Sequence, residues 1–254
     1  MKYRATVGYD GTNFFGFQRQ ANHRSVQGEL ESAIEKVLGT GEKIMVTGAG
    51  RTDTGVHASG QVISFDVHEE WKHGVARLQR AINICLPFDV AVNDVAECDG
   101  RFHARFSAVS RTYDYSVLVL DDVRRPLERL YEWQVYDMPD VQQMNEAAGQ
   151  LVGEHDFAAF GSAPVGEETV RRVVQARWMP HQLEGKNQDR RLTFTIEANA
   201  FLFRMVRRIV ATLMRVGHGK LDAKEVNRMM IDKQGNAAFG AAPACGLCLV
   251  NVRY

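Results

Sequence analysis

The sequence of 254 residues has little of what marks a secreted, fibrous or membrane-spanning chain. Only 4 residues are cysteine and only 6 are proline, too few for a disulfide framework or a collagen-like repeat. No apolar run approaches the roughly 18 residues of a membrane-spanning helix, and the first residues, Met1–Arg4, lack the apolar core of a signal peptide. We therefore expect a globular protein in the cytoplasm, with one large domain or two small ones and no membrane contact.

The sequence also lacks an excess of charge, because 31 Lys and Arg balance 31 Asp and Glu. Any binding to nucleic acid would therefore need a local basic surface. Two segments without acidic residues offer one: residues 101–111 contain 3 arginines, and residues 204–220 contain 5 basic residues. The arginines of the second segment fall on one stripe of a predicted helix: Arg204, Arg207, Arg208 and Arg215. A solvated helix face is the alternative, but such faces usually mix charges of both signs. The pattern favours a nucleic-acid or phosphate surface.

The cysteines suggest one metal site, at Cys245-Gly-Leu-Cys248. A pair with this spacing, joined by two further thiols, would bind zinc. Leu247 and Leu249 instead indicate a strand, and side chains three positions apart on a strand point to opposite faces. We therefore expect inert thiols and no metal.

The periodicity of apolar residues predicts the same element order twice. Alternation over Lys2–Tyr9 predicts a strand, and Ser25 is a suitable N-cap for a helix that ends at Leu38. The other elements of the first half are strands at 44–47, 61–67 and 90–95 and a helix at 75–86. The second half has strands at 111–120, 170–179, 191–198 and 247–253 and helices at 141–151 and 201–216.

Each half therefore reads β-α-β-β-α-β. This order predicts an α+β fold of two ferredoxin-like (RRM-like) halves related by duplication, with mainly antiparallel sheets and helices on one side. We expect a cleft between the halves, where ligands tend to bind. The expected domains are residues 1–104, with a glycine-rich loop, and residues 105–254, with the basic helix.

The glycine-rich segment 47–58 is the densest chemical signal in the sequence. Three glycines within eight residues predict a loop with unusual backbone turns, and their spacing fits neither a dinucleotide-binding fingerprint nor a phosphate-binding P-loop. Asp53, flanked by Arg51 and His57, could act as a nucleophile or a base. The alternative is a turn in which Asp53 caps local amides.

The segment Gly48–Ala58 resembles the signature of the tRNA pseudouridine synthase A family. Further segments resemble the family's other motifs in the right order and cover nearly the whole chain. They are Tyr9–Gly11, Gly16–Gln20, Ser25–Leu30, Phe102–Ala108, Arg111–Tyr113, Gly153–Phe157, Phe201–Arg207 and Ala242–Leu247. One departure is Phe17, where the family often carries tryptophan.

The resemblance implies an isomerase that converts uridine to pseudouridine in the anticodon stem-loop of tRNA, at positions 38, 39 and 40, without a cofactor. It implies Asp53 as the catalytic carboxylate, Tyr113 as the ring that stacks on the base and takes the proton from carbon 5, and Arg207 as the partner of Asp53. It also implies a homodimer with tRNA touching both subunits. The expected substrate-binding residues are Arg51, His57, Arg105, Arg111, Arg204, Arg208 and Arg215.

Two other classes of function remain. A passive RNA-binding module would use the same basic surface, but it would not need Asp53, Tyr113 and Arg207, and its sheet should carry an aromatic pattern that we do not find. A nucleoside or nucleotide hydrolase would also use a carboxylate at a glycosidic bond, but it would release the free base.

Overall fold

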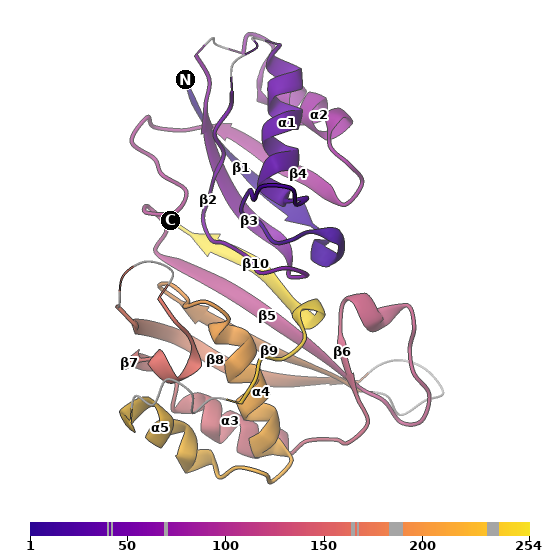
Figure 1. Ribbon diagram of the computed structural model, residues 1–254, viewed down its shortest axis with the longest axis vertical. Helices are drawn as coiled ribbons and strands as arrows, with labels where there is room; N and C mark the ends of the chain where they lie inside the picture. The colour runs from indigo at the N-terminus through magenta and orange to yellow at the C-terminus, as the bar shows by residue number, and fades with distance from the viewer. Residues whose placement is uncertain are drawn as a thin grey trace. The chain divides into compact units, whose positions relative to one another are not determined.

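The computed structural model describes residues 1–39, 41, 43–68, 71–163, 166, 168–182, 190–232 and 239–254. The chain divides into two compact units, one of residues 1–109 with 248–254 and one of residues 110–247 (Figure 1). This boundary falls a few residues after the expected one at 104/105. The C-terminal strand, which we assigned to the second domain, groups with the first unit.

The first unit is built on a four-strand ferredoxin-like arrangement. Its elements are β1 (Lys2–Tyr9), α1 (Val26–Leu38), β2 (Thr47–Gly48), β3 (His57–Asp66), α2 (Val75–Cys85) and β4 (Val90–Glu97), with β10 (Leu247–Arg253) added. The sheet runs β4–β1–β3 with antiparallel pairing, and β2 pairs antiparallel with one end of β3. At the other end of β3, Cys248 and Leu249 pair in parallel with His57 and Ala58.

Apolar periodicity explains the core of this unit. On β1 the alternate residues Tyr3, Ala5, Val7 and Tyr9 are buried, because successive side chains of a strand point to opposite faces. Helices α1 and α2 pack together on one side of the sheet (Figure 1). Each large apolar side chain that they bury contributes about 1.5–3 kcal/mol to stability.

Helix α1 matches its predicted bounds because each end has a suitable capping residue. The Ser25 hydroxyl accepts the N–H of Gly28 at 3.3 Å, as an N-cap does. Gly39 follows the last turn with φ of +63°, a left-handed conformation that suits glycine.

The second unit also combines a mainly antiparallel sheet with helices. It contains β5 (Ser110–Val119), β6 (Trp133–Val135), α3 (Val141–Gly149), β7 (Gly153–Asp156), β8 (Val170–Gln182), β9 (Arg190–Ala198), α4 (Met205–Gly217) and α5 (Ala223–Asp232). The sheet runs β5–β9–β8–β7 with antiparallel pairing, and β6 pairs in parallel with β5. Helix α3 packs on β8 and contacts both α4 and α5, so the helices gather on one side (Figure 1). The mixed α+β fold with mainly antiparallel strands is therefore confirmed.

Three predicted elements differ clearly from the structure. Strand β3 begins at His57, where we expected residue 61. The helix expected from residue 201 begins at Met205, because Arg204 takes a left-handed conformation with φ of +59° and Phe203 donates its N–H to Ser162. Residues 44–46 do not form the expected strand, because the N–H groups of Ile44 and Val46 bond to the carboxylates of Glu35 and Glu31. Strands β6 and β7 and helix α5 were not predicted.

Within the described residues, no helix is long and apolar enough to cross a membrane.

Candidate active site

The loop between β2 and β3 carries Asp53 and is held by backbone hydrogen bonds along its length. Ala49 donates to the carbonyl of Val62 at 2.8 Å where the loop begins, and Val56 donates to the carbonyl of Asp53 at 3.1 Å where it ends. The neighbouring segment 14–20 adds a bond from Phe17 N–H to the carbonyl of Thr52 at 3.1 Å. The residue directly before Asp53 is thus fixed from outside the loop.

The buried side chains of Gln61 and Tyr9 form hydrogen bonds with the loop. Gln61 on β3 is fully buried; its Oε1 accepts the N–H of Gly50 at 3.3 Å, and its Nε2 donates to the carbonyl of Gly50 at 2.9 Å. The same Nε2 lies 3.4 Å from the hydroxyl of Tyr9, which is 2.8 Å from the hydroxyl of Thr52. Burial raises the pKa of Tyr9 far above its ordinary value, so the phenol stays neutral.

Segment 14–20 packs closely against the loop at two glycines, where a Cβ atom would not fit. Gly16 has φ of +92°, and a Cβ there would lie 2.7 Å from the carbonyl oxygen of Thr52. A Cβ on Gly48 would lie 2.5 Å from the ring of Phe17. An aromatic ring at position 17 thus covers the start of the loop.

Segment 14–20 is itself fixed to α1 by buried polar groups. Gln27 accepts the N–H of Arg19 at 2.9 Å and donates to Glu31 at 2.9 Å and to the carbonyl of Val46 at 3.1 Å. The buried carboxylate of Glu31 lies 2.9 Å from the guanidinium of Arg19, as a buried charge requires. The motifs at 16–20 and 25–30 therefore support the loop that carries Asp53.

The three predicted residues of the loop differ in exposure. Arg51 is exposed and Asp53 is half-buried, so both reach the surface of the unit. His57 is 7% exposed, and its Nδ1 accepts the N–H of Gly11 at 3.0 Å and lies 3.2 Å from Asp10. His57 is therefore largely buried within the framework of the loop, and its contact with the substrate stays a prediction.

Tyr113 and Arg207 belong to the second unit. Tyr113 lies on β5, with its ring edge-on to Phe201 at 5.2 Å. Arg207 on α4 donates from Nε to the carbonyl of Ala242 at 2.7 Å, and Ala242 donates back to the carbonyl of Arg207 at 3.0 Å. The next residue, Pro243, accepts the hydroxyl of Tyr115 at 2.8 Å. Burial raises the pKa of Tyr115, and the positive charge of Arg207 partly opposes the rise.

Segment 242–243 thus brings Arg207 beside Tyr115, which lies on the same face of β5 as Tyr113. Asp53 lies in the other unit, and its pairing with Arg207 stays a prediction.

The other predicted binding residues are spread over both units. Arg111 is buried, with its guanidinium on the carbonyl of Asn199 at 2.8 Å. Arg204 is exposed beside the ring of Phe203, at 4.9 Å, and precedes α4. Arg208 and Arg215 are half-buried on α4, and the guanidinium of Arg215 lies 3.8 Å over the ring of Phe239. The expected stripe is therefore only partly exposed.

Two cysteines lie close to residues described above, because Cys248 pairs with His57 and Cys245 influences the pKa of Tyr115. Among the described residues there is no cluster of three or more His, Cys, Asp or Glu that could hold a metal ion.

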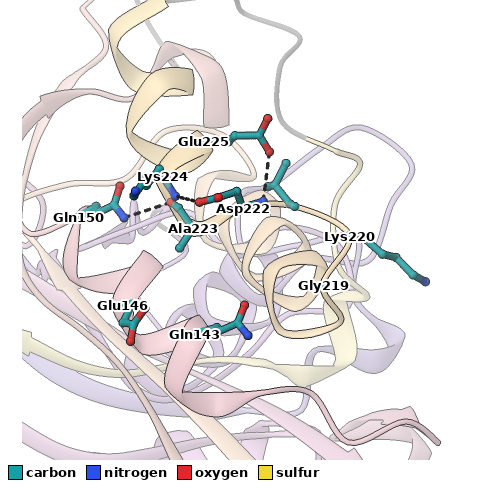
Figure 2. Close-up of a pocket in the computed structure, with 10 residues that line it drawn as sticks. Gln143, Glu146, Gln150, Gly219, Lys220, Asp222, Ala223, Lys224 and Glu225 are labelled. Carbon is teal, nitrogen blue, oxygen red and sulfur yellow. Dashed lines mark hydrogen bonds between the residues drawn. The ribbon is translucent and has the colours of Figure 1, made fainter.

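In the second unit, a hollow of about 620 Å³ lies between α3 and the start of α5 (Figure 2). Its polar groups bond to one another, as Gln150 does to the carbonyl of Ala223 at 3.1 Å. The residues predicted for the active site do not line this hollow.

Comparison of the sequence with known proteins identifies the class of protein to which this chain belongs. A model of the family described as tRNA pseudouridine synthase matches residues 5–107 and 147–254. The chain is 40% identical over 255 residues to the tRNA pseudouridine synthase A of Latilactobacillus sakei subsp. sakei (strain 23K), covering 100% of this chain and 98% of that protein. It is 42% identical over 245 residues to the protein of the same name from Halalkalibacterium halodurans, covering 95% of this chain and 88% of that protein.

The chain therefore belongs to the tRNA pseudouridine synthase family and is an isomerase. Among solved structures, it aligns with a chain of the archaeal box H/ACA sRNP Nop10–Cbf5 complex at a TM-score of 0.30 and 12% identity. That alignment covers 84% of this chain and 44% of the other.

Proposed function

We propose that this chain isomerises uridine to pseudouridine in the anticodon stem-loop of tRNA, at positions 38, 39 and 40, with Asp53 as the catalytic carboxylate. The observation that carries the proposal is the loop around Asp53, whose backbone is fixed by Gln61, Tyr9 and Phe17. A carboxylate held in advance is what a reaction at a glycosidic bond needs. Family membership supplies the class of reaction.

The reaction keeps every atom of the substrate. The bond from the ribose carbon to nitrogen 1 of the base breaks, and a bond from the same carbon to carbon 5 forms. The proton that leaves carbon 5 ends on nitrogen 1. Asp53 can serve by attacking the ribose, attacking the base or removing a ribose proton, and all three routes need its ionised form. No cofactor enters this scheme, because there is no net oxidation or reduction.

We assign Tyr113 the role of stacking on the base and taking the proton from carbon 5. Arg207 is assigned to pair with Asp53 and hold it ionised. In support, Arg207 is anchored through Nε to Ala242 and lies beside Tyr115, on the Tyr113 face of β5.

The tRNA would be held by basic side chains of both units. Arg51 is exposed beside Asp53 and suits a contact to phosphate or to the space left by a flipped base. Further contacts are assigned to exposed or half-buried arginines: Arg105, Arg204, Arg208 and Arg215. Part of this proposal is a cytoplasmic homodimer in which tRNA touches both subunits.

The position of the modified nucleotide tests this proposal. Purified protein would be incubated with a tRNA transcript and with its isolated anticodon stem-loop, and pseudouridines would be mapped chemically. We expect modification at positions 38–40 in both substrates. Modification confined to another arm of the tRNA would contradict the assignment. Release of free uracil would favour the hydrolase alternative.

A further inference from the structure

Phe106 is an exposed aromatic side chain that the proposed mechanism does not use. It lies in the first unit between β4 and β5 and is 77% exposed. Single exposed apolar side chains are ordinary on protein surfaces. Phe106 differs because its ring has a fixed partner: His103 stacks on it with ring centres 4.4 Å apart and planes at 30°.

The backbone around the ring is closed by several hydrogen bonds. His103 Nδ1 accepts the N–H groups of both Arg105 and Phe106 at 3.2 Å, which fixes the imidazole against the turn. Ser107 donates its N–H to the carbonyl of His103 at 2.9 Å, and its hydroxyl accepts the N–H of His103 at 3.1 Å. Because the ring is held before any ligand arrives, little side-chain freedom would be lost on binding.

The segment that carries Phe106 is basic. The guanidinium of Arg105 lies 5.6 Å from the ring centre of Phe106, and segment 101–111 contains 3 arginines and no acidic residue. Protein partners usually bind larger contiguous apolar patches. Single-stranded RNA is bound by separate aromatic rings interleaved with cations, on which unpaired bases stack.

We propose that Phe106, backed by His103, is a stacking site for an unpaired nucleobase of the tRNA substrate. This inference rests on the proposed function, because it takes tRNA as the ligand. It adds an aromatic contact to a segment in which the sequence indicated only the charge of the arginines.

Direct binding of tRNA to Phe106 variants tests the proposal. For Phe106→Ala we expect the Kd for tRNA to rise between about 5-fold and about 150-fold, the range that corresponds to loss of one stacked base. We expect kcat/KM to fall by the same factor. Phe106→Leu keeps an apolar side chain without a ring and should bind as weakly as Phe106→Ala, whereas Phe106→Tyr should bind like the wild type.

Phe88 supplies the matched control. It is a fully exposed phenylalanine in the same unit, and it lies beside Asp89, outside the basic segment. Phe88→Ala should leave the Kd unchanged. As a second readout, tRNA should quench the added fluorescence of Phe106→Trp, because stacking on a base quenches indole emission, and it should quench Phe88→Trp less.

Three results would overturn the proposal. One is wild-type affinity in Phe106→Leu, and another is an equal loss of affinity in Phe106→Ala and Phe88→Ala. The third is a change of oligomeric state in Phe106→Ala with unchanged affinity, which would make Phe106 a contact between subunits. Pseudouridine formation by the wild type is measured on the same tRNA. Its absence would refute the proposed function, whereas its presence with any of the three results would refute this inference alone.

Discussion

Thr52, the residue directly before Asp53, shows how single residues fix the loop between β2 and β3. Its carbonyl accepts the N–H of Phe17 at 3.1 Å, and its hydroxyl lies 2.8 Å from that of Tyr9. Gly16 packs against the same carbonyl, with no room for a Cβ. The position of Asp53 therefore depends on residues outside the loop, on β1 and in segment 14–20.

Removing the Tyr9 hydroxyl should disturb this arrangement. Tyr9→Phe leaves the buried hydroxyl of Thr52 and the amide of Gln61 short of a partner, which costs about 1–3 kcal/mol of unfolding free energy. We expect kcat to fall at least about tenfold, because a small displacement of a catalytic group is costly, while tRNA affinity changes little. Denaturant unfolding and single-turnover kinetics measure the two effects.

Tyr3→Phe is the matched control for that variant. Tyr3 lies on the same strand, is equally buried and directs its hydroxyl toward the sulfur of Met1 at 3.1 Å. It should keep the turnover of the wild type. Equal losses of turnover in Tyr3→Phe and Tyr9→Phe would show that the Tyr9 hydroxyl has no special role in placing Asp53.

Gly16→Ala should damage the same loop by crowding. The new Cβ would lie 2.7 Å from the Thr52 carbonyl at φ of +92°, and such strain costs about 3 kcal/mol. Gly39→Ala also has a positive φ, of +63°, but meets no atom within 4 Å, so it should cost about 1–2 kcal/mol. Thermal unfolding and pseudouridine formation would be compared, and only Gly16→Ala should lose activity. Full activity in Gly16→Ala would mean that segment 14–20 does not position the loop.

At the scale of single residues, the sequence indicated Asp53 but not the residues whose hydrogen bonds hold its loop. The glycine spacing of 48–55 and the family motif pointed to the loop. Gln61 was missed because its partner Tyr9 lies 52 positions away in the chain, and no local pattern announces such a contact. The sequence also indicated His57 as a substrate contact, which stays a prediction, but not its burial or its bond to Gly11.

Among the elements, strands and helices with complete local signals were predicted to the residue. The alternation of β1 and the capped ends of α1 gave their observed bounds. Helix α4 was predicted to begin at Phe201 because residues 201–204 are compatible with a helix. The hydrogen bond from Phe203 to Ser162, a contact distant in sequence, ends that possibility. Strand β7, which pairs with β8, consists of glycine and polar residues. It therefore has no alternation of apolar and polar residues from which a strand could be predicted.

Two neighbouring arginines on helix α4 should differ in function, and substitutions at Arg207 and Arg208 should show the difference. Arg207→Lys keeps the charge but loses the planar group that bonds Ala242 through Nε and is proposed to grip Asp53. We expect turnover to fall about 10- to 100-fold with a smaller change in tRNA affinity. Single-turnover rates and binding titrations measure the two.

Arg208, one position along the same helix, provides the comparison. Arg208→Ala should weaken tRNA binding and reduce the slope of log affinity against log salt by about one, as loss of one phosphate contact does. Normal turnover of Arg207→Lys together with weaker tRNA binding would make Arg207 a phosphate contact and exclude its pairing with Asp53.

At the scale of the whole molecule, the residues that we propose for catalysis are divided between two units. Asp53 and its supporting network belong to the first unit, whereas Tyr113 and Arg207 belong to the second. The first unit carries the strand order of a ferredoxin-like sheet, as its element order predicted, whereas β10, the last strand predicted for the second half, groups with the first unit. The same order also serves binding modules, so the function follows from the residues of the site and from the family match.

The central claim is that a fixed Asp53 isomerises uridine in tRNA without loss of any atom. Wild type and Asp53→Asn would be incubated with the same tRNA, which would then be digested to nucleosides, separated and weighed by mass spectrometry. We predict that the wild type converts uridine to a nucleoside of identical mass and different retention. Asp53→Asn should bind the tRNA normally and form none of this product. Pseudouridine from Asp53→Asn at a rate near that of the wild type, or free uracil from the wild type, would contradict the account.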